Sequence, residues 1–102
     1  MIRAYDEKSQ LHSLSFEDIQ EIELFVNDFF TIDQMGFQFT TTDGQVYVCN
    51  EDSPVFKETF KELTVILPEF DQAVADLYRT ANMCLEPTKL YDRQNGVIEF
   101  TE

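Results

Sequence analysis

The sequence has little positive charge, and this shortage excludes whole classes of partner. Its 102 residues hold 7 Lys and Arg against 20 Asp and Glu, which gives a net charge of −13 at pH 7. A chain this acidic repels nucleic acid and the anionic face of a membrane, so we expect it to bind neither directly. Its direct partners should therefore be cationic.

Glycine and histidine are also scarce, which leaves little material for an active site. Two of the three glycines, Gly44 and Gly96, fit turns, so no glycine-rich phosphate loop remains. The only histidine, His12, lies in a polar segment that is typical of a solvated surface. The acidic residues do not take the alternating spacing of a calcium loop. The sequence thus predicts a protein that is not an enzyme and uses no cofactor and no metal.

The two cysteines and the lack of long apolar runs bear on location. Cys49 and Cys84 are far apart and form no Cys-x-x-Cys motif, so free thiols are favoured over a single disulfide and no zinc site is indicated. The N-terminus, residues 1–8, lacks the apolar run of a signal peptide. No segment approaches the ~20 apolar residues that a membrane span requires. A soluble cytoplasmic protein is expected.

What the sequence does have is the material for a core. Its hydrophobic fraction is 43% and it contains ten Phe, which argues against disorder. The length fits one domain over residues 1–102.

Residues 16–30 form the strongest predicted helix. Ser15 stands at the N-cap position, with Glu17 and Asp18 in the first turn, where the helix dipole favours anions. The apolar residues that fall on one side at helical spacing are Phe16, Ile19, Ile22, Val26, Phe29 and Phe30.

The opposite side of that helix is predicted to be an acidic surface. On a helical wheel, Glu17, Glu21 and Asp28 lie within about 40° of one another. Leu24 falls inside this acidic wedge and Phe25 lies at its edge, so both are expected to be exposed or covered by a partner.

Residues 36–49 predict a β-hairpin. Asp43-Gly44 is the signature of a two-residue turn, which would pair Thr41 with Val46. The side chains that would then share one face against the helix are Phe37, Phe39, Thr41, Val46 and Val48.

Two more helices are expected. Ser53 as N-cap and Pro54 at the first helical position begin one helix, which Pro68 ends. Its inner residues are Phe56, Phe60, Leu63 and Leu67. The next helix spans about 69–84, with Phe70, Val74, Leu77, Tyr78 and Ala81 inward.

The two ends of the chain add strands. Residues 1–8 predict a short edge strand, and Asn95-Gly96 marks a turn between two strand-like runs. The order of elements predicts an α+β domain with about three helices packed on a small antiparallel sheet that has one or two β-hairpins.

The acidic residues are unevenly spread along the chain. Between Lys8 and Lys57 there is no Lys or Arg, and this stretch holds nine acids: Glu17, Asp18, Glu21, Glu23, Asp28, Asp33, Asp43, Glu51 and Asp52. Like charges at helical spacing oppose folding unless cations offset them. Such a run is either a solvated surface or a surface used for attraction, and both interpretations remain open.

As a binding surface, the run is interpreted as a mimic of DNA. Duplex DNA presents one negative charge per ~1.7 Å of axis, in two ridges. The helical carboxylates would lie roughly 6–10 Å apart and form one row, and the acids near the two turns would form a second. The predicted partner-binding residues are Glu17, Asp18, Glu21, Leu24, Phe25, Asp28, Asp33, Asp43, Glu51 and Asp52.

In size and acid content, the chain resembles the small bacterial DNA-mimic proteins, among them a mimic of similar mass that binds the histone-like protein HU. The resemblance implies a monomeric inhibitor without catalysis, whose carboxylates imitate phosphates and whose partner is a basic DNA-binding protein of the HU class.

Two other functions fit the same charge pattern. The first is an immunity protein that neutralises a cationic nuclease toxin, with Leu24, Phe25 or an outward-facing Tyr47 as apolar anchors. The second is a small non-catalytic assembly subunit whose acidity only keeps it soluble.

Overall fold

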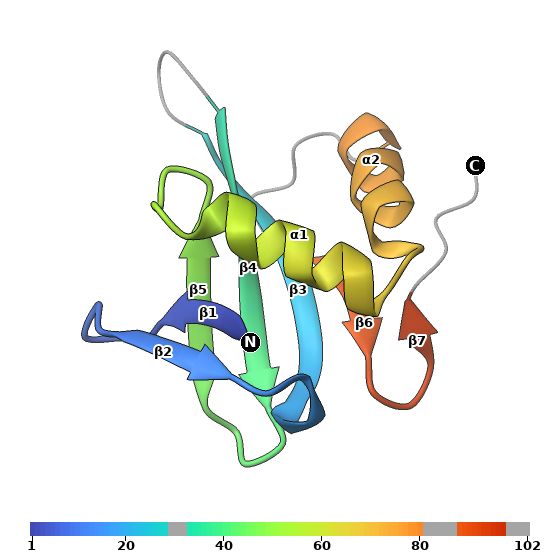
Figure 1. Cartoon of the computed structure of the whole chain (residues 1–102). Helices are drawn as coiled ribbons and strands as arrows, with labels where there is room; N and C mark the ends of the chain where they lie inside the picture. The colour runs from blue at the N-terminus through green and yellow to red at the C-terminus, as the bar shows by residue number, and fades with distance from the viewer. Residues whose placement is uncertain (29–32, 81–87, 98–102) are drawn as a thin grey trace.

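An antiparallel sheet of seven strands is the frame of the protein. We analysed a computed structural model, which describes residues 1–28, 33–80 and 88–97 (Figure 1). The strands are β1 (Ile2–Tyr5), β2 (Leu11–Leu14), β3 (Ile19–Asp28), β4 (Asp33–Thr41), β5 (Val46–Asn50), β6 (Thr88–Asp92) and β7 (Gly96–Val97). Their spatial order is β2-β1-β5-β4-β3-β6-β7.

The described helices are fewer than predicted. They are a 3-10 turn η1 (Phe16–Asp18) and two α-helices, α1 (Phe56–Ile66) and α2 (Phe70–Thr80). The predicted fold of about three helices on a small sheet is therefore wrong, because the sheet dominates and the first predicted helix is a strand.

A β-bulge explains why residues 16–30 imitate a helix in the sequence. Ile19 pairs with Thr41 of β4, but the next pair joins Glu21 to Thr40, so Gln20 is an extra residue. The bulge separates two core-facing residues by three positions, as a helix would. After the bulge the strand alternates normally.

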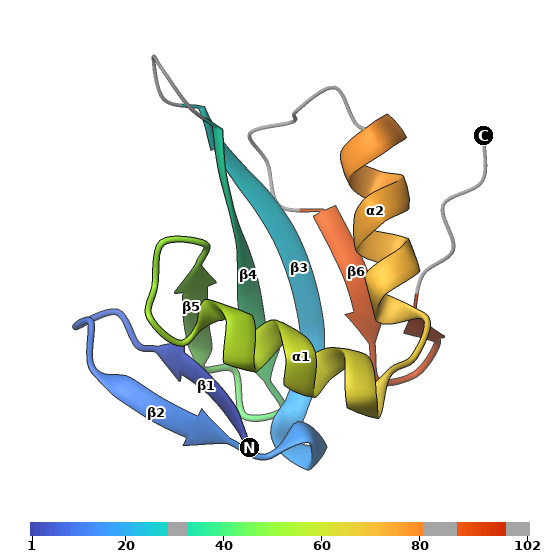
Figure 2. The same cartoon turned by 45° about the horizontal axis from the view of Figure 1, so that its top comes forward.

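Both α-helices lie on the same side of the sheet. Figure 1 and Figure 2 show α1 crossing in front of β5, β4 and β3, with α2 beside it near β6. The β1–β2 hairpin also packs under α1: the Thr59 hydroxyl donates to the Arg3 carbonyl oxygen over 2.7 Å. No described element covers the other side of β3, β4 and β5, which we call the open face.

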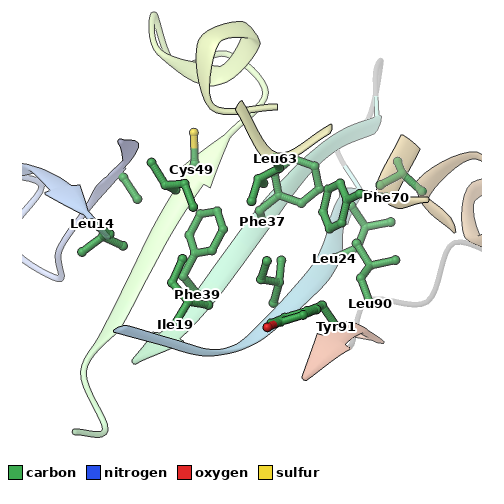
Figure 3. Packing of buried hydrophobic residues seen from close by; sticks show 14 of the residues in the cluster. Leu14, Ile19, Leu24, Phe37, Phe39, Cys49, Leu63, Phe70, Leu90 and Tyr91 are labelled. Atoms are coloured by element: carbon green, nitrogen blue, oxygen red, sulfur yellow. The ribbon is translucent and has the colours of Figure 1, made fainter. Parts of the chain in front are cut away.

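The core lies between these helices and the covered face of the sheet (Figure 3). Phe37 on β4 is at its centre and is fully buried. Its ring stacks on Phe56 at a centroid distance of 5.4 Å and meets Phe60 edge-on, also at 5.4 Å. Phe70 of α2 contacts the same ring at 5.4 Å. One aromatic side chain thus joins the sheet to both α-helices.

The predicted hairpin forms, but its register is shifted by one residue. Thr40, not Thr41, pairs with Val46. The Thr41 N–H donates to the Gln45 carbonyl oxygen over 2.8 Å, and Gly44 has a φ of +88°. The turn therefore has three residues and ends in a left-handed glycine. As a result, Val46 and Val48 lie on the open face rather than beside Phe37 and Phe39.

The helix predictions from Ser53 onward are largely confirmed. The Ser53 hydroxyl accepts a hydrogen bond from the Val55 N–H over 3.3 Å, but α1 begins at Phe56 with Val55 at its N-cap position. The predicted N-cap at Ser53 and first helical position at Pro54 are therefore wrong. Of the predicted inner residues, Phe56, Leu63, Phe70 and Val74 are buried, and Phe60 and Leu67 are partly buried. For α2, positions 81–84 lie outside the described residues, so Ala81 and Cys84 cannot be placed.

The ends of the chain are partly as predicted. β1 pairs with β2 on one side and meets β5 at Tyr5 on the other, so it is not an edge strand. The strand at this edge of the sheet is β2, which lies in the polar segment that contains His12. The second hairpin is confirmed: Tyr91 pairs with Val97, and Gly96 has a φ of +75°. Among the described residues, no helix is both long and apolar enough to cross a membrane.

The Thr59 hydroxyl gives a first test of the packing of α1 on β1. Replacing Thr59 with valine keeps the side-chain shape but leaves the Arg3 carbonyl oxygen without this donor in a buried site. We expect a loss of about 1–2 kcal/mol of unfolding free energy, measured by urea denaturation. An unchanged midpoint would mean that the hydrogen bond contributes nothing to stability.

Candidate functional site

The open face is built by alternate residues of three strands. On β3, Glu21, Glu23 and Phe25 point to it, because Ile22 and Leu24 between them are buried in the core. All three are partly exposed. Their partners across β4 are Thr40, Gln38 and Gly36, and these pair in turn with Val46, Val48 and Asn50 of β5. The centre of the face therefore carries two carboxylates beside uncharged polar and apolar side chains.

Within the described part of the chain, one cation, Lys89, pairs with the carboxylates on this face. The Lys89 ammonium lies 3.1 Å from a Glu21 oxygen and 3.8 Å from an Asp92 oxygen. Glu23 stands opposite Lys89 in the β3–β6 ladder. These carboxylates together raise the pKa of Lys89, chiefly through the hydrogen bond from its ammonium to Glu21. One positive charge is thus shared among three negative ones.

Asp92 already has partners within its own turn. It accepts hydrogen bonds from the Gln94 N–H over 3.0 Å and from the Asn95 N–H over 2.7 Å. These bonds and that of the Asn95 side chain lower the pKa of Asp92, with the side chain contributing most. Asp92 is only 8% exposed. Its carboxylate therefore shapes the β6–β7 turn, whereas Glu21 and Glu23 face outward.

Glu23 is a carboxylate whose pKa is raised in the folded protein. Partial burial raises its pKa, repulsion from Glu21 adds to this effect, and attraction to Lys89 opposes it. The charged form of Glu23 is therefore less stable in the folded protein than in a freely solvated chain. A cation brought to this face by a partner would relieve that cost.

The other predicted acids divide between the two ends of the sheet. Glu17 and Asp18 in η1 are exposed and lie near the Asp43 turn, because the Thr42 N–H donates to the Asp18 carbonyl oxygen over 2.8 Å. The Arg93 guanidinium donates to the backbone carbonyl of Glu17 and leaves its carboxylate unpaired among the described residues.

Glu51 and Asp52 lie at the opposite end, after β5. Both are exposed, and the Glu51 carboxylate accepts a hydrogen bond from the Met35 N–H over 3.3 Å. Asp28 and Asp33 are backbone partners at the same end of the β3–β4 ladder, and their side chains lie outside the described part of the structure. The acids thus follow the length of the central strands and do not form a row on a helix.

The predicted apolar contacts need correction. Leu24 is 3% exposed and belongs to the core, because in a strand it points away from the neighbouring glutamates. Tyr47 pairs with Phe39 on the covered side and its ring meets that of His12 at 5.3 Å, so it does not face outward. Phe25 does lie on the open face. The apolar side chain that the sequence interpretation missed there is Val46, which is 46% exposed.

Phe25 covers the backbone of Gly36 on the neighbouring strand. A Cβ atom at position 36 would lie 2.5 Å from the Phe25 Cζ, so only glycine lets the ring lie flat at this point. The sequence signal was present, since a glycine inside a strand often marks close approach of another group.

His12 was predicted to be a solvated surface residue, but it is only partly exposed and contacts Asp6. Its Nε2 lies 2.7 Å from an Asp6 carboxylate oxygen. Backbone N–H groups of Gln10 and Lys8, together with His12, lower the pKa of Asp6, with Gln10 contributing most. The pair borders a hollow of about 640 Å³ between the β1–β2 and β4–β5 turns. Asp6 here closes a turn and orients the imidazole, which is a structural role.

Comparison with known proteins adds no relative: no family model, curated protein or solved structure matches this chain. The function is therefore inferred from the geometry and charge of the chain itself.

Glu23 gives a test of the electrostatic description of the open face. Because its pKa is raised in the folded state, its charge destabilises the fold above that pKa and has no effect at pH values where it is protonated in both states. We expect Glu23→Gln to increase the unfolding free energy at pH 7 by roughly 0.2–1 kcal/mol, the range for interactions between solvent-exposed charges.

Urea denaturation of both proteins at pH 7 and near pH 4 checks this prediction. The gain should be present at pH 7 and shrink at the lower pH. If Glu23→Gln destabilised the protein at pH 7, attraction to Lys89 would outweigh desolvation and repulsion, and our description of Glu23 would be wrong.

Proposed function

We propose that this protein is a non-catalytic inhibitor that mimics DNA and occupies the basic nucleic-acid-binding surface of a partner. A histone-like nucleoid protein of the HU class is the favoured partner, and the two would meet in the cytoplasm. The observation that carries the proposal is the pair Glu21 and Glu23, partly exposed on a face that no described element covers and, among the described residues, served by one lysine.

The physical basis is the imbalance of charge on this face. Folding leaves Glu23 partly desolvated beside a second carboxylate, so the charge on Glu23 destabilises the isolated protein. A partner that supplies Lys or Arg side chains would pair them and release the counterions that each surface holds. Exposed acids also lie beyond both ends of β5, a strand of five residues that spans roughly 17 Å at about 3.3 Å per residue.

Salt dependence of binding tests this proposal. Titration of purified HU-class protein with the full chain should show binding at low ionic strength. We expect the affinity to fall about tenfold or more between roughly 50 and 200 mM NaCl, because several ion pairs form at once. Absence of binding at the low salt concentration, or binding that does not respond to salt, would contradict DNA mimicry.

One observation favours a second candidate, the immunity protein. Val46 is 46% exposed and Phe25 is partly exposed on the same face as the glutamates, and an apolar anchor ringed by charge is typical of tight, specific interfaces. A cationic nuclease toxin would use both features. In that case Val46→Asp should abolish tight binding even at low salt, whereas a DNA mimic should lose little.

A further inference from the structure

β2 is an edge of the sheet with an open backbone. It stands at one end of the strand order, and β1 is its only strand partner among the described residues, from Ile2 opposite Leu14 to Tyr5 opposite Leu11. Both views show β2 on the outside of the molecule with no drawn element beyond it (Figures 1 and 2).

The alternation of hydrogen-bonded and non-hydrogen-bonded pairs in the β1–β2 hairpin determines which backbone groups of β2 do not bond to β1. The Asp6 N–H donates to the Gln10 carbonyl oxygen over 3.0 Å, so hydrogen-bonded pairs alternate from there along the hairpin. The next such pair is Ala4 with His12. The N–H and C=O groups of Leu11 and Ser13 therefore point away from β1 and can pair with another strand.

Apart from its short length of four residues, this edge lacks the features that usually prevent pairing. Residues 9–16 contain no Asp, Glu, Lys, Arg or Pro, in a chain of net charge −13. Leu11 is 39% exposed, and the β1–β2 register has no bulge. Edge strands that stay single commonly carry a lysine, a proline or a bulge.

We propose that β2 pairs antiparallel with β2 of a second copy, which joins two sheets into one two-fold dimer. When a two-fold axis relates two antiparallel copies of one strand, directly opposite residues must point to the same face of the sheet. This holds only if the axis passes through one residue, which then lies opposite its own copy. That residue is His12 or Ser13. Centring on His12 pairs Leu11 of each copy with Ser13 of the other, so the outward N–H and C=O groups of both residues find partners. Centring on Ser13 would place Leu11 opposite Ser15, whose carbonyl oxygen already accepts a hydrogen bond from the Asp18 N–H.

The dimer has a salt dependence opposite to that of DNA mimicry. Each copy carries −13, so two copies repel at long range, and added salt screens that repulsion. Self-association should therefore strengthen as NaCl rises, while binding to a basic partner should weaken. This separates the two proposals, since either can fail without the other.

Sedimentation equilibrium of the full chain, from micromolar to high micromolar concentration at two salt concentrations, tests the dimer. We expect a monomer–dimer equilibrium that shifts toward dimer at the higher salt. Ser13→Pro removes the outward N–H without removing a bond to β1, and should weaken association about tenfold or more. Ser13→Thr, which keeps the N–H, should leave association unchanged.

A second edge variant keeps the test decisive. If Ser13→Pro unfolds, Leu11→Lys places a charge on the same edge and should have the same effect. A chain that stays monomeric at every concentration and salt, or a dimer insensitive to both edge variants, would overturn the proposal.

Discussion

Replacing Phe37 with alanine should destabilise the protein by about 3–5 kcal/mol, the largest effect we expect from any single substitution. The reason is its position: the ring is fully buried and contacts Phe56 of α1 and Phe70 of α2 from the centre of the sheet. Its removal leaves a cavity that both helices and β4 border. A domain of this size is stable by roughly 5–15 kcal/mol, so much of its stability would be lost.

Urea denaturation followed by circular dichroism measures this effect. Val65→Ala is the matched control, because Val65 lies on α1 but is 72% exposed and should change stability by no more than about 0.5 kcal/mol. A Phe37→Ala midpoint close to that of the control would mean that the aromatic cluster does not hold the helices on the sheet.

Reversing the charge of both Glu21 and Glu23 to lysine should reduce affinity for the basic partner by about 30- to 100-fold. Two attractive pairs are lost and two repulsive ones are added, which together amount to roughly 2–3 kcal/mol at a partly desolvated interface. The fold should survive, since both side chains point away from the core.

A control with the same net charge separates local contact from long-range attraction. Glu62→Lys with Glu69→Lys changes the charge equally, but on the helical side of the molecule. It should weaken binding only slightly. The neutral pair Glu21→Gln and Glu23→Gln serves if the lysines disturb β3 beside Lys89. Equal losses in the open-face and helical-side variants would mean that the open face is not the contact surface.

The parts of the fold that the sequence predicted correctly are those with strong local signals. Gly44 and Gly96 mark turns that need positive φ, and both hairpins form around them. Pro68 lies in the turn between α1 and α2. The shifted register at Asp43-Gly44 shows the limit of such signals, because the same dipeptide fits two-residue and three-residue turns.

β3 was mispredicted because two patterns overlap in it. The bulge at Gln20 gives a helical spacing at its start, and Ile22 to Phe25 alternate as a strand only over a few residues. Which pattern prevails depends on pairing with β4 and β6, and these contacts are long-range. The candidate site differs from the prediction as a result. Glu21 lies on the surface as predicted, Glu23 lies beside it on the open face, and Leu24 is buried in the core.

Displacement of duplex DNA is the most direct measurement of the proposed function. A labelled duplex bound to HU-class protein is titrated with this chain at low salt, and fluorescence anisotropy reports the free DNA. We predict that the wild-type chain and the Glu62→Lys, Glu69→Lys variant release the duplex, and that the Glu21→Lys, Glu23→Lys variant does not. If the duplex stays bound at saturating wild-type chain, or if the open-face variant displaces it equally well, the carboxylates of the open face do not stand in for phosphates.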